Sequence, residues 1–307
     1  MNINISLLKR LGLVFVILTL LSGFLYTTSN ITALKSYGEA PTYKVYALNL
    51  PDTISFADEK IRMTAPDLRE RLDRELLVNT YWQSNMMLML KRANKFFPTI
   101  EKVLKEEGVP ADLKYLSVIE SGLENSISPA GAKGFWQIMR TTGREYGLEV
   151  NSNVDERYHI EFATRVAAKY LKKAKEKFGS WTLAAASYNR GISGIQRNLN
   201  QQKVDTYFDL RLGNETSRYV FRVLAVKEIM ENPLKYGYVF DQNDLYEVVP
   251  VRYHGLDTAI SNLATFAQKM GVNYKVLKIH NPWLLQNHLN NKSRKYYEIA
   301  IPEKGFY

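Results

Sequence analysis

Glu120 stands at the end of an apolar segment, and its carboxyl group is the first candidate for acid–base chemistry in this sequence. Pro110 favours the first turn of a helix and Gly122 favours its end, which predicts a helix of roughly three turns. Leu113 and Leu116 precede Glu120 at helical spacing, so the carboxyl shares a face with side chains that we expect to be buried.

This placement of Glu120 predicts a raised pKa. Apolar surroundings disfavour a carboxylate, and so does the negative end of the helix dipole in the last turn. A glutamic acid that keeps its proton near neutral pH is suited to general acid catalysis. A glutamate at a helix end can equally be structural, so on this segment alone both interpretations stay open.

Other catalytic chemistries lack their usual residues. The chain has no cysteine, which excludes disulfides, thiolate metal sites and a thiol nucleophile. The sequence contains no nucleophile elbow, phosphate-binding glycine loop or dinucleotide fingerprint. The histidines do not have metal-ligand spacing; they are His159, His254, His280 and His288. We therefore expect neither a metal nor a cofactor.

The net charge of +10 favours an anionic partner, which could be nucleic acid, a membrane surface or an anionic polymer of the cell wall. Twenty tyrosines suit a groove for sugar rings or nucleobases as well as they suit a core. A nucleic-acid partner is disfavoured because no reader motif is present and because the N-terminus looks like an export segment.

The N-terminal residues 1–27 are predicted to be a signal peptide or a membrane anchor. A basic start, Lys9 and Arg10, precedes a run of sixteen uncharged residues, which indicates that the rest of the chain works outside the cytoplasm. Whether this segment is cleaved stays open, because no clear cleavage site follows it. Residues 28–66 are predicted to be a spacer with one or two short extended pieces.

Residues 67–240 carry a strongly helical pattern and are predicted to form one domain. We expect helices over residues 67–90 and 91–107, with a break near Pro98. Phe162 is assigned to the apolar stripe of a long helix. The further predicted helices cover residues 141–147, 160–178, 181–188 and 216–229.

Residues 245–303 have a different pattern, which predicts a separate small module of βααβ order. Its expected strands cover residues 246–253 and 296–301, and its expected helices cover residues 258–270 and 274–280. The predicted fold class is therefore mainly α, with a small α+β module at the C-terminus.

Four short motifs together resemble those of the lysozyme-like lytic transglycosylases, above all their membrane-bound D type. They occur in the order and approximate spacing of that family: Glu120-Ser-Gly122, Gly134-Phe-Trp-Gln-Ile-Met139, Ser187-Tyr-Asn-Arg-Gly191 and Glu215-Thr-Ser-Arg-Tyr219. The resemblance implies a helical domain of the goose-type lysozyme and soluble lytic transglycosylase kind. The C-terminal module resembles a degenerate LysM domain, a peptidoglycan-binding fold.

The resemblance also implies a reaction and a site. Glu120 would be the single acid/base, cleaving the bond between N-acetylmuramic acid and N-acetylglucosamine without water and leaving 1,6-anhydromuramoyl ends. The residues that would hold the sugar or orient Glu120 are Ser121, Gln137, Tyr188, Asn189 and Tyr219. The implied partner is the peptidoglycan glycan strand, and the implied location is the periplasm or cell envelope, with the inner membrane as a possible anchor.

Two alternatives follow from the same pattern. One is a hydrolase of the same bond, as in goose-type lysozyme, which would need water and usually a second carboxylate. The other is a non-catalytic peptidoglycan-binding protein. Glu120 is the only acid that these motifs mark as catalytic, which favours the transglycosylase.

Overall fold

The structure of the protein, a computed structural model, describes residues 45–307. Residues 48–307 form one compact unit. The predicted signal peptide or anchor and the first part of the predicted spacer lie outside the described residues. Within residues 45–307 no helix is both long enough and apolar enough to cross a membrane.

A β-hairpin opens the described chain, where we predicted a spacer. Strands β1 (Thr53–Phe56) and β2 (Glu59–Arg62) pair antiparallel, and Ala57 and Asp58 turn between them with positive φ. One face of the hairpin packs into the helical core through Ile54, Phe56, Ile61 and Met63. The extended pieces are thus present, but they are part of the folded domain, because their alternating apolar residues have a core to cover.

The first two long helices are divided at a different place from the one predicted. Helix α2 spans Pro66–Tyr81 and α3 spans Gln83–Glu106, so the break falls at Trp82 and the predicted break near Pro98 is wrong. Pro98 lies inside α3. A proline in a helix interior costs about 3 kcal/mol, and α3 offsets this cost by burying apolar side chains both before and after the proline.

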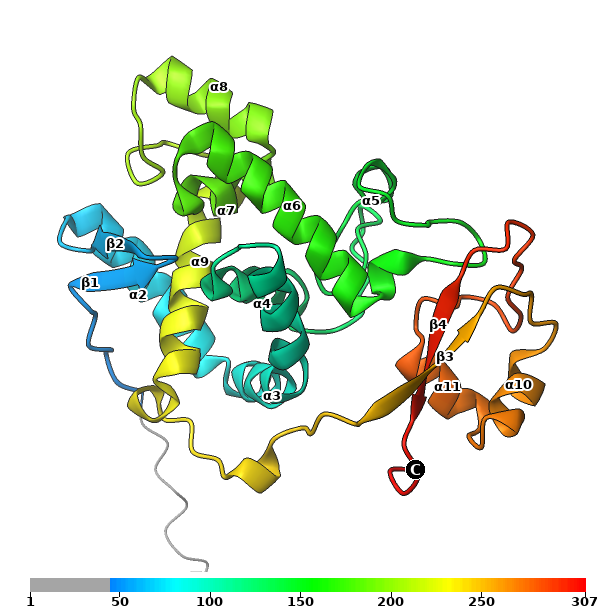
Figure 1. Ribbon diagram of the computed structural model, residues 1–307. Coiled ribbons are helices and arrows are strands. Elements are labelled where there is room, and N and C mark those ends of the chain that lie inside the picture. Colours follow the sequence, from blue (N-terminus) through cyan, green and yellow to red (C-terminus); the bar gives the residue numbers. More distant parts are fainter. Residues whose placement is uncertain (1–44) are drawn as a thin grey trace, which may run out of the picture. The chain divides into compact units, whose positions relative to one another are not determined.

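Helix α7 (Trp181–Arg190) packs against both α6 (Ile160–Phe178) and α9 (Asn214–Glu231), and α9 also packs against α4 (Lys114–Ser121) (Figure 1). The three consecutive alanines of α7 are fully buried, which allows close helix packing. An ion pair between Arg218 Nε and Glu75 Oε1 at 2.6 Å joins α9 to α2. Helix α8 (Ile192–Gln202) was not predicted.

Shorter elements connect these helices. Helix α4 (Lys114–Ser121) follows the 3₁₀ turn η1 (Ala111–Leu113), and α5 (Arg140–Glu145) follows the loop after α4. Further 3₁₀ turns are η2 (Glu156–Tyr158), η3 (Pro233–Tyr236) and η4 (Gln242–Asp244).

The C-terminal module has the predicted βααβ order. Strand β3 (Val251–Leu256) pairs antiparallel with β4 (Tyr297–Pro302), and α10 (Leu263–Lys269) and α11 (Tyr274–His280) lie between them in sequence. Helix α10 begins five residues later than predicted because Asn262 caps it: its Oδ1 accepts from the backbone N–H groups of Ala264 and Thr265. The mainly helical fold with a small α+β module is confirmed.

The module contacts the helical domain that precedes it through the segment between α5 and α6. The backbone N–H of Asp155 donates to the carbonyl of Trp283 at 3.0 Å, and Asn153 Nδ2 donates to the carbonyl of His288 at 2.9 Å. Val154 and Tyr158 belong to the apolar core of the module. The two parts are therefore joined by a shared core and by hydrogen bonds.

Candidate active site

The end of α4 positions Glu120 as the sequence predicts. Gly122 adopts φ +61° and its N–H donates to the carbonyl of Val118 at 2.7 Å, which is a left-handed C-cap. Leu113 and Leu116 are completely buried. The helix is thus fixed by its core face, and Glu120 lies in its last turn with the carboxyl group next to α9.

Glu120 accepts a hydrogen bond from Tyr219 of α9, whose hydroxyl lies 2.5 Å from Oε1. Burial raises the pKa of Glu120 to about 7, against the lowering effects of the Tyr219 hydrogen bond and the Arg222 charge, while Glu215 raises it further. The carboxyl group is therefore close to half-protonated at neutral pH, which is the state that a group acting first as acid and then as base needs.

Tyr188 also lies beside this carboxyl. Burial raises the pKa of Tyr188 well above its usual value, and the charge of Glu120 adds to the effect. Its hydroxyl donates to the carbonyl of Trp136 at 2.8 Å, and its ring meets that of Tyr170 edge-on at 5.5 Å. Tyr188 therefore stays protonated and ties α7 to the loop that follows α4.

Ser121 and Gln137 make their hydrogen bonds within that loop. Ser121 Oγ donates to the carbonyls of Phe135, at 2.9 Å, and Ser117, at 3.0 Å. Gln137 Nε2 donates to the carbonyl of Gly134 at 2.9 Å and to Ser126 Oγ at 3.0 Å. Ser121 thus holds the loop against the end of α4, whereas Gln137 ties the loop to itself. We predict both as sugar-holding or orienting groups.

Asn189 joins the end of α7 to the start of α9. Its Nδ2 donates to Glu215 Oε1 at 2.9 Å, and its Oδ1 accepts from Thr216 Oγ1 at 2.7 Å. The structure therefore brings Tyr188 and Tyr219 to Glu120 directly, whereas Asn189 acts on the neighbouring Glu215.

Two residues near Glu120 were not assigned a role from the sequence. Glu215 and Arg222 both act on the charge of Glu120, and Arg222 Nη2 also donates to the carbonyl of Ile119 at 3.1 Å. They flank Tyr219 at spacings of four and three residues, so they lie on its face of α9. That helical spacing from Tyr219 is the signal that could have found them.

Metal ligands are not assembled in the described part of the chain: residues 45–307 contain no group of three or more histidines, aspartates or glutamates that could hold an ion. The arrangement around Glu120 consists of one carboxyl of raised pKa, two protonated phenols, one guanidinium and one exposed carboxylate. These groups can move a proton to and from one bound oxygen atom.

Comparison with known proteins assigns two segments. Residues 97–209 match the family described as "Transglycosylase SLT domain", and residues 252–305 match "Soluble lytic transglycosylase C-terminal LysM-like domain". The first match includes Glu120, Ser121, Gln137, Tyr188 and Asn189, while Tyr219 lies beyond it.

The chain is also similar to two named proteins. The chain is 28% identical, over 82% of its length, to "Membrane-bound lytic murein transglycosylase D" of Escherichia coli K12, and covers 56% of that protein. It is 25% identical over 36% of its length to a "Putative tributyltin chloride resistance protein" of Alteromonas, covering 55% of it. The chain thus spans about half the length of these relatives.

A comparison with solved structures matches part of the chain to an inactive mutant of the lytic transglycosylase Slt from Pseudomonas aeruginosa. It matches 49% of this chain and 26% of its own, with 23% identity and a TM-score of 0.38.

Proposed function

We propose that this chain, which carries a transglycosylase SLT domain and a LysM-like C-terminal domain, is a lytic transglycosylase of peptidoglycan. The observation that carries the proposal is the single carboxyl of Glu120, with its pKa raised to about 7 and with Tyr219 bonded to it. The name of the Escherichia coli relative, a murein transglycosylase, supports the same substrate class.

Glu120 acts first as the general acid. In its protonated form it donates a proton to the glycosidic oxygen between N-acetylmuramic acid and N-acetylglucosamine, and the bond from that oxygen to C1 breaks. The hydrogen bond from Tyr219 stabilises the carboxylate that this proton transfer leaves behind. Burial raises the pKa of Glu120 to about 7, so a large fraction of the carboxyl groups is protonated near neutral pH and available to donate.

Glu120 then acts as the base. Its carboxylate takes the proton from the C6 hydroxyl of the muramic acid residue while O6 attacks C1, which closes the 1,6-anhydro ring. The proton that Glu120 gave away is thereby recovered, and no water enters the balance. The nucleophile is part of the substrate, so the reaction does not require the second carboxylate that an ordinary glycosidase uses.

Product analysis tests this proposal. The full chain is incubated with purified peptidoglycan and the soluble fragments are analysed by mass spectrometry. We expect 1,6-anhydromuramoyl ends, which weigh one water less than reducing ends. A folded Glu120→Gln protein should release no fragments, and release at an unchanged rate would refute a catalytic role for Glu120. Absence of release by the wild-type protein would instead leave a wall-binding protein as the better description.

A hydrolase is the second candidate, and the position of Glu215 favours it. Glu215 is exposed, lies within electrostatic range of Glu120 and is held by Asn189 at 2.9 Å. A second carboxylate so placed could activate a water molecule. Reducing ends in the product spectrum, lost on Glu215→Gln substitution, would establish hydrolysis instead of anhydro-ring formation.

We also propose that the protein works in the cell envelope, on peptidoglycan glycan strands in the periplasm, with residues 1–27 as its link to the inner membrane if they are not removed. The support is the basic, then apolar, N-terminal sequence and the words "membrane-bound" in the name of the relative. Fractionation of cells that produce the chain, followed by N-terminal sequencing, tests both statements. Recovery of an uncleaved chain in the cytosol would contradict them.

A further inference from the structure

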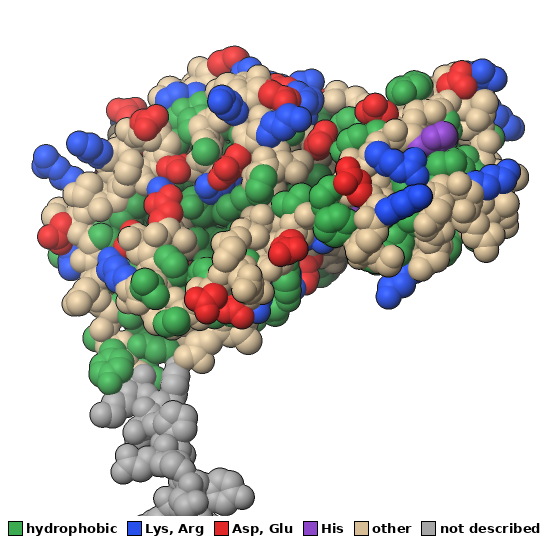
Figure 2. All heavy atoms as spheres, turned by 60° about the horizontal axis from the view of Figure 1, so that its bottom comes forward, with side chains coloured by type: hydrophobic (Ala, Val, Ile, Leu, Met, Phe, Trp, Pro, Cys, Tyr) green, Lys and Arg blue, Asp and Glu red, His purple; other side chains and the backbone are tan. Residues whose placement is uncertain are grey.

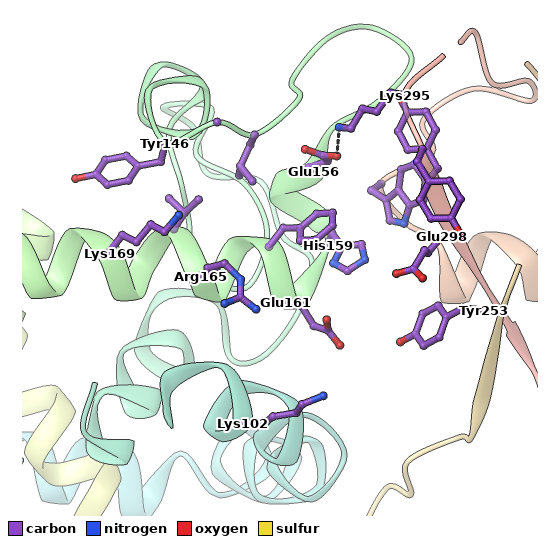
Figure 3. Close-up of a pocket in the computed structure, with 17 residues that line it drawn as sticks. Lys102, Tyr146, Glu156, His159, Glu161, Arg165, Lys169, Tyr253, Lys295 and Glu298 are labelled. Atoms are coloured by element: carbon purple, nitrogen blue, oxygen red, sulfur yellow. Dashed lines mark hydrogen bonds and ion pairs between the residues drawn. The ribbon is translucent and has the colours of Figure 1, made fainter. Parts of the chain in front are cut away.

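A cavity of about 570 Å³ lies where α6 meets the C-terminal module. Its volume falls in the range of small-ligand sites. Within the described chain, none of the six residues of the candidate active site lines it. Figure 3 shows Glu161 and Arg165 of α6 on one side of the cavity, and Tyr253 and Glu298 of the module on the other.

The two walls of this junction cavity are held in place by the contacts between domain and module. Lys295 Nζ forms ion pairs with Glu149, at 2.9 Å, and with Glu156, at 2.5 Å. Tyr297 donates its hydroxyl hydrogen to Glu149 Oε2 at 2.8 Å, and its ring stacks on Trp283. The cavity is therefore preformed, because both walls are tied to the same anchored segment.

Charged groups of both signs line the cavity without ionic partners. In the described part of the chain, no ion pair or side-chain hydrogen bond is formed by Lys102, Lys169, Glu161 or Glu298. Burial raises the pKa of Tyr253, and the carboxylates of Glu161 and Glu298 add to this effect, so these two acids from different walls converge on one phenol.

The cavity also contains a polar atom without a partner. Nδ1 of His159 is buried and has no hydrogen bond within residues 45–307. Burial lowers the pKa of His159 to about 4, so the ring is neutral at physiological pH, and it stacks on Phe162 at 4.1 Å. An unpaired buried nitrogen costs free energy, and His159 therefore contributes only a neutral ring to the wall of the cavity.

Exposed aromatic side chains surround these groups. Phe162, which we placed in the buried stripe of its helix, is 42% exposed, and Tyr253 and Tyr296 are 55% and 65% exposed. The stripe prediction is wrong for Phe162 because its first-turn position faces the cavity instead of the core. Figure 2 shows one face of the protein, on which hydrophobic side chains reach the surface between acidic and basic groups.

We propose that this junction cavity is a second binding site for peptidoglycan, which takes the peptide stem of the polymer. The stem carries carboxylates, which suit Lys102 and Lys169, and in stems with a diamino acid an ammonium group, which suits Glu161 and Glu298. Its alanine methyl groups suit the exposed rings. The sugar chain without its stem has no ammonium group, so the paired acids favour the stem as the ligand. This inference rests on the proposed function for the identity of the polymer.

Calorimetric titration of the full chain carrying Glu120→Gln tests the proposal, with a free stem tetrapeptide that contains a diamino acid as the probe. We expect one peptide bound per chain. Lys169→Met should weaken binding about tenfold, as expected for loss of a hydrogen bond to a charged group. Lys173→Met, one turn further along the exposed surface of α6 and outside the cavity, is the matched control and should bind as the parent does.

A tetrapeptide with an acetylated side-chain amine tests whether the acidic residues of the cavity bind the ammonium group. Glu298→Gln should also weaken binding about tenfold, but it should make no difference to a tetrapeptide whose side-chain amine is acetylated. Near-ultraviolet circular dichroism of each variant establishes that the module is folded. Absence of tetrapeptide binding, or binding that neither Lys169→Met nor Glu298→Gln changes, overturns the proposal.

The result of this binding test can be distinguished from the result of the test of the proposed function. Wild-type protein that forms anhydro ends but does not bind the tetrapeptide would remove this second site and leave the transglycosylase in place. Tetrapeptide binding that depends on Lys169 and Glu298, in a protein that forms no anhydro ends, would do the reverse.

Discussion

Tyr219 donates a hydrogen bond of 2.5 Å to Oε1 of Glu120, across the contact between α9 and α4. Burial and this hydrogen bond have opposite effects on the pKa of Glu120: burial raises it and the bond lowers it. The pKa of about 7 therefore results from two opposing effects, the burial of Glu120 at the end of α4 and the hydrogen bond from α9. A substitution that alters either effect should change this pKa.

Replacement of Tyr219 by phenylalanine removes the bond that favours the carboxylate. The pKa of Glu120 should rise, so the basic limb of the pH–activity profile should move to higher pH. Turnover at the optimum should fall about tenfold, because the carboxylate formed by proton transfer loses a charge-assisted hydrogen bond. The profile is measured as release of soluble fragments from peptidoglycan.

Tyr236→Phe is the matched control for this experiment. Tyr236 also donates to a glutamate of α9, Glu228, at 3.1 Å, but it lies beyond the far end of that helix. Its removal should leave the profile unchanged. An unmoved basic limb in Tyr219→Phe would mean that Glu120 does not control that limb.

Replacement of Glu120 by glutamine should stabilise the protein at alkaline pH. The folded-state pKa of Glu120 is raised, so its contribution to stability is fully present below about pH 4.5 and is lost as the pH rises through about 7. Glutamine is neutral throughout. The free energy of unfolding of Glu120→Gln, relative to wild type, should therefore increase by about 3 kcal/mol between pH 4 and pH 8. Urea titration of both proteins at the two pH values measures this difference, and an equal difference at both would contradict a raised pKa.

Replacement of Glu215 by glutamine removes a negative charge that raises the pKa of Glu120. The basic limb of the activity profile should move to lower pH, opposite to the shift expected for Tyr219→Phe. The anhydro ends should persist, since the transglycosylase needs one carboxyl. Glu70→Gln, an exposed glutamate of α2, is the control and should change nothing. A shift to higher pH would show that Glu215 acts on Glu120 in some other way.

Local sequence patterns were sufficient to predict some elements accurately. The bounds of α6 and α11 agree with the prediction, and Gly122 ends α4 as expected. In each case one apolar face and one stop signal lie in the same short segment. The raised pKa of Glu120 was predicted for the same reason, because Leu113 and Leu116 indicate a buried face at that position.

Other features depend on partners that are distant in the sequence. The hairpin at residues 53–62 looked like a spacer because its alternation is short, and only the helices around it show which face is covered. The backbone N–H of Ala57 bonds to Asp112 at 2.8 Å, a contact that no local pattern contains. The junction cavity likewise needs both α6 and the module, so no motif indicated it.

In the candidate site, too, some residues were indicated by local motifs and others only by the contacts between helices. Glu120, Tyr188 and Tyr219 were found from motifs, whereas the roles of Glu215 and Arg222 required α9 to be placed against α4. The catalytic role of Glu120 stays a prediction, and so do the substrate-binding roles of Ser121, Gln137, Tyr188, Asn189 and Tyr219.

Asp155 should be essential for stability. It is 1% exposed and bonds to Arg157 through both carboxylate oxygens at 2.8 Å. Asparagine keeps the shape but leaves the buried guanidinium without a counter-charge, which costs about 3 to 5 kcal/mol. Asp155→Asn should lower the free energy of unfolding by that amount in urea titration. Asp205→Asn, at an exposed position, should have no measurable effect, and equal stabilities of the two variants would contradict this account.

Gly134 should be the most sensitive position in the loop that follows α4. Its φ is +78°, and a Cβ atom there would stand 2.1 Å from the carbonyl oxygen of Arg157. Gly134→Ala therefore combines an unfavourable backbone conformation with a clash against backbone, and should lower the free energy of unfolding by more than about 3 kcal/mol. Because Gln137 bonds to the carbonyl of Gly134, displacement of the loop should also reduce peptidoglycan cleavage.

The Gly131→Ala variant separates the effect of the backbone conformation from the effect of the steric clash. Gly131 lies in the same loop with φ +83°, but a Cβ atom there would meet nothing within 4 Å. Its substitution should therefore cost about 1 kcal/mol, the backbone contribution alone. Thermal or urea unfolding of the two variants side by side gives the difference. If Gly131→Ala were as destabilising as Gly134→Ala, the backbone conformation and not the contact with Arg157 would account for the sensitivity of this loop.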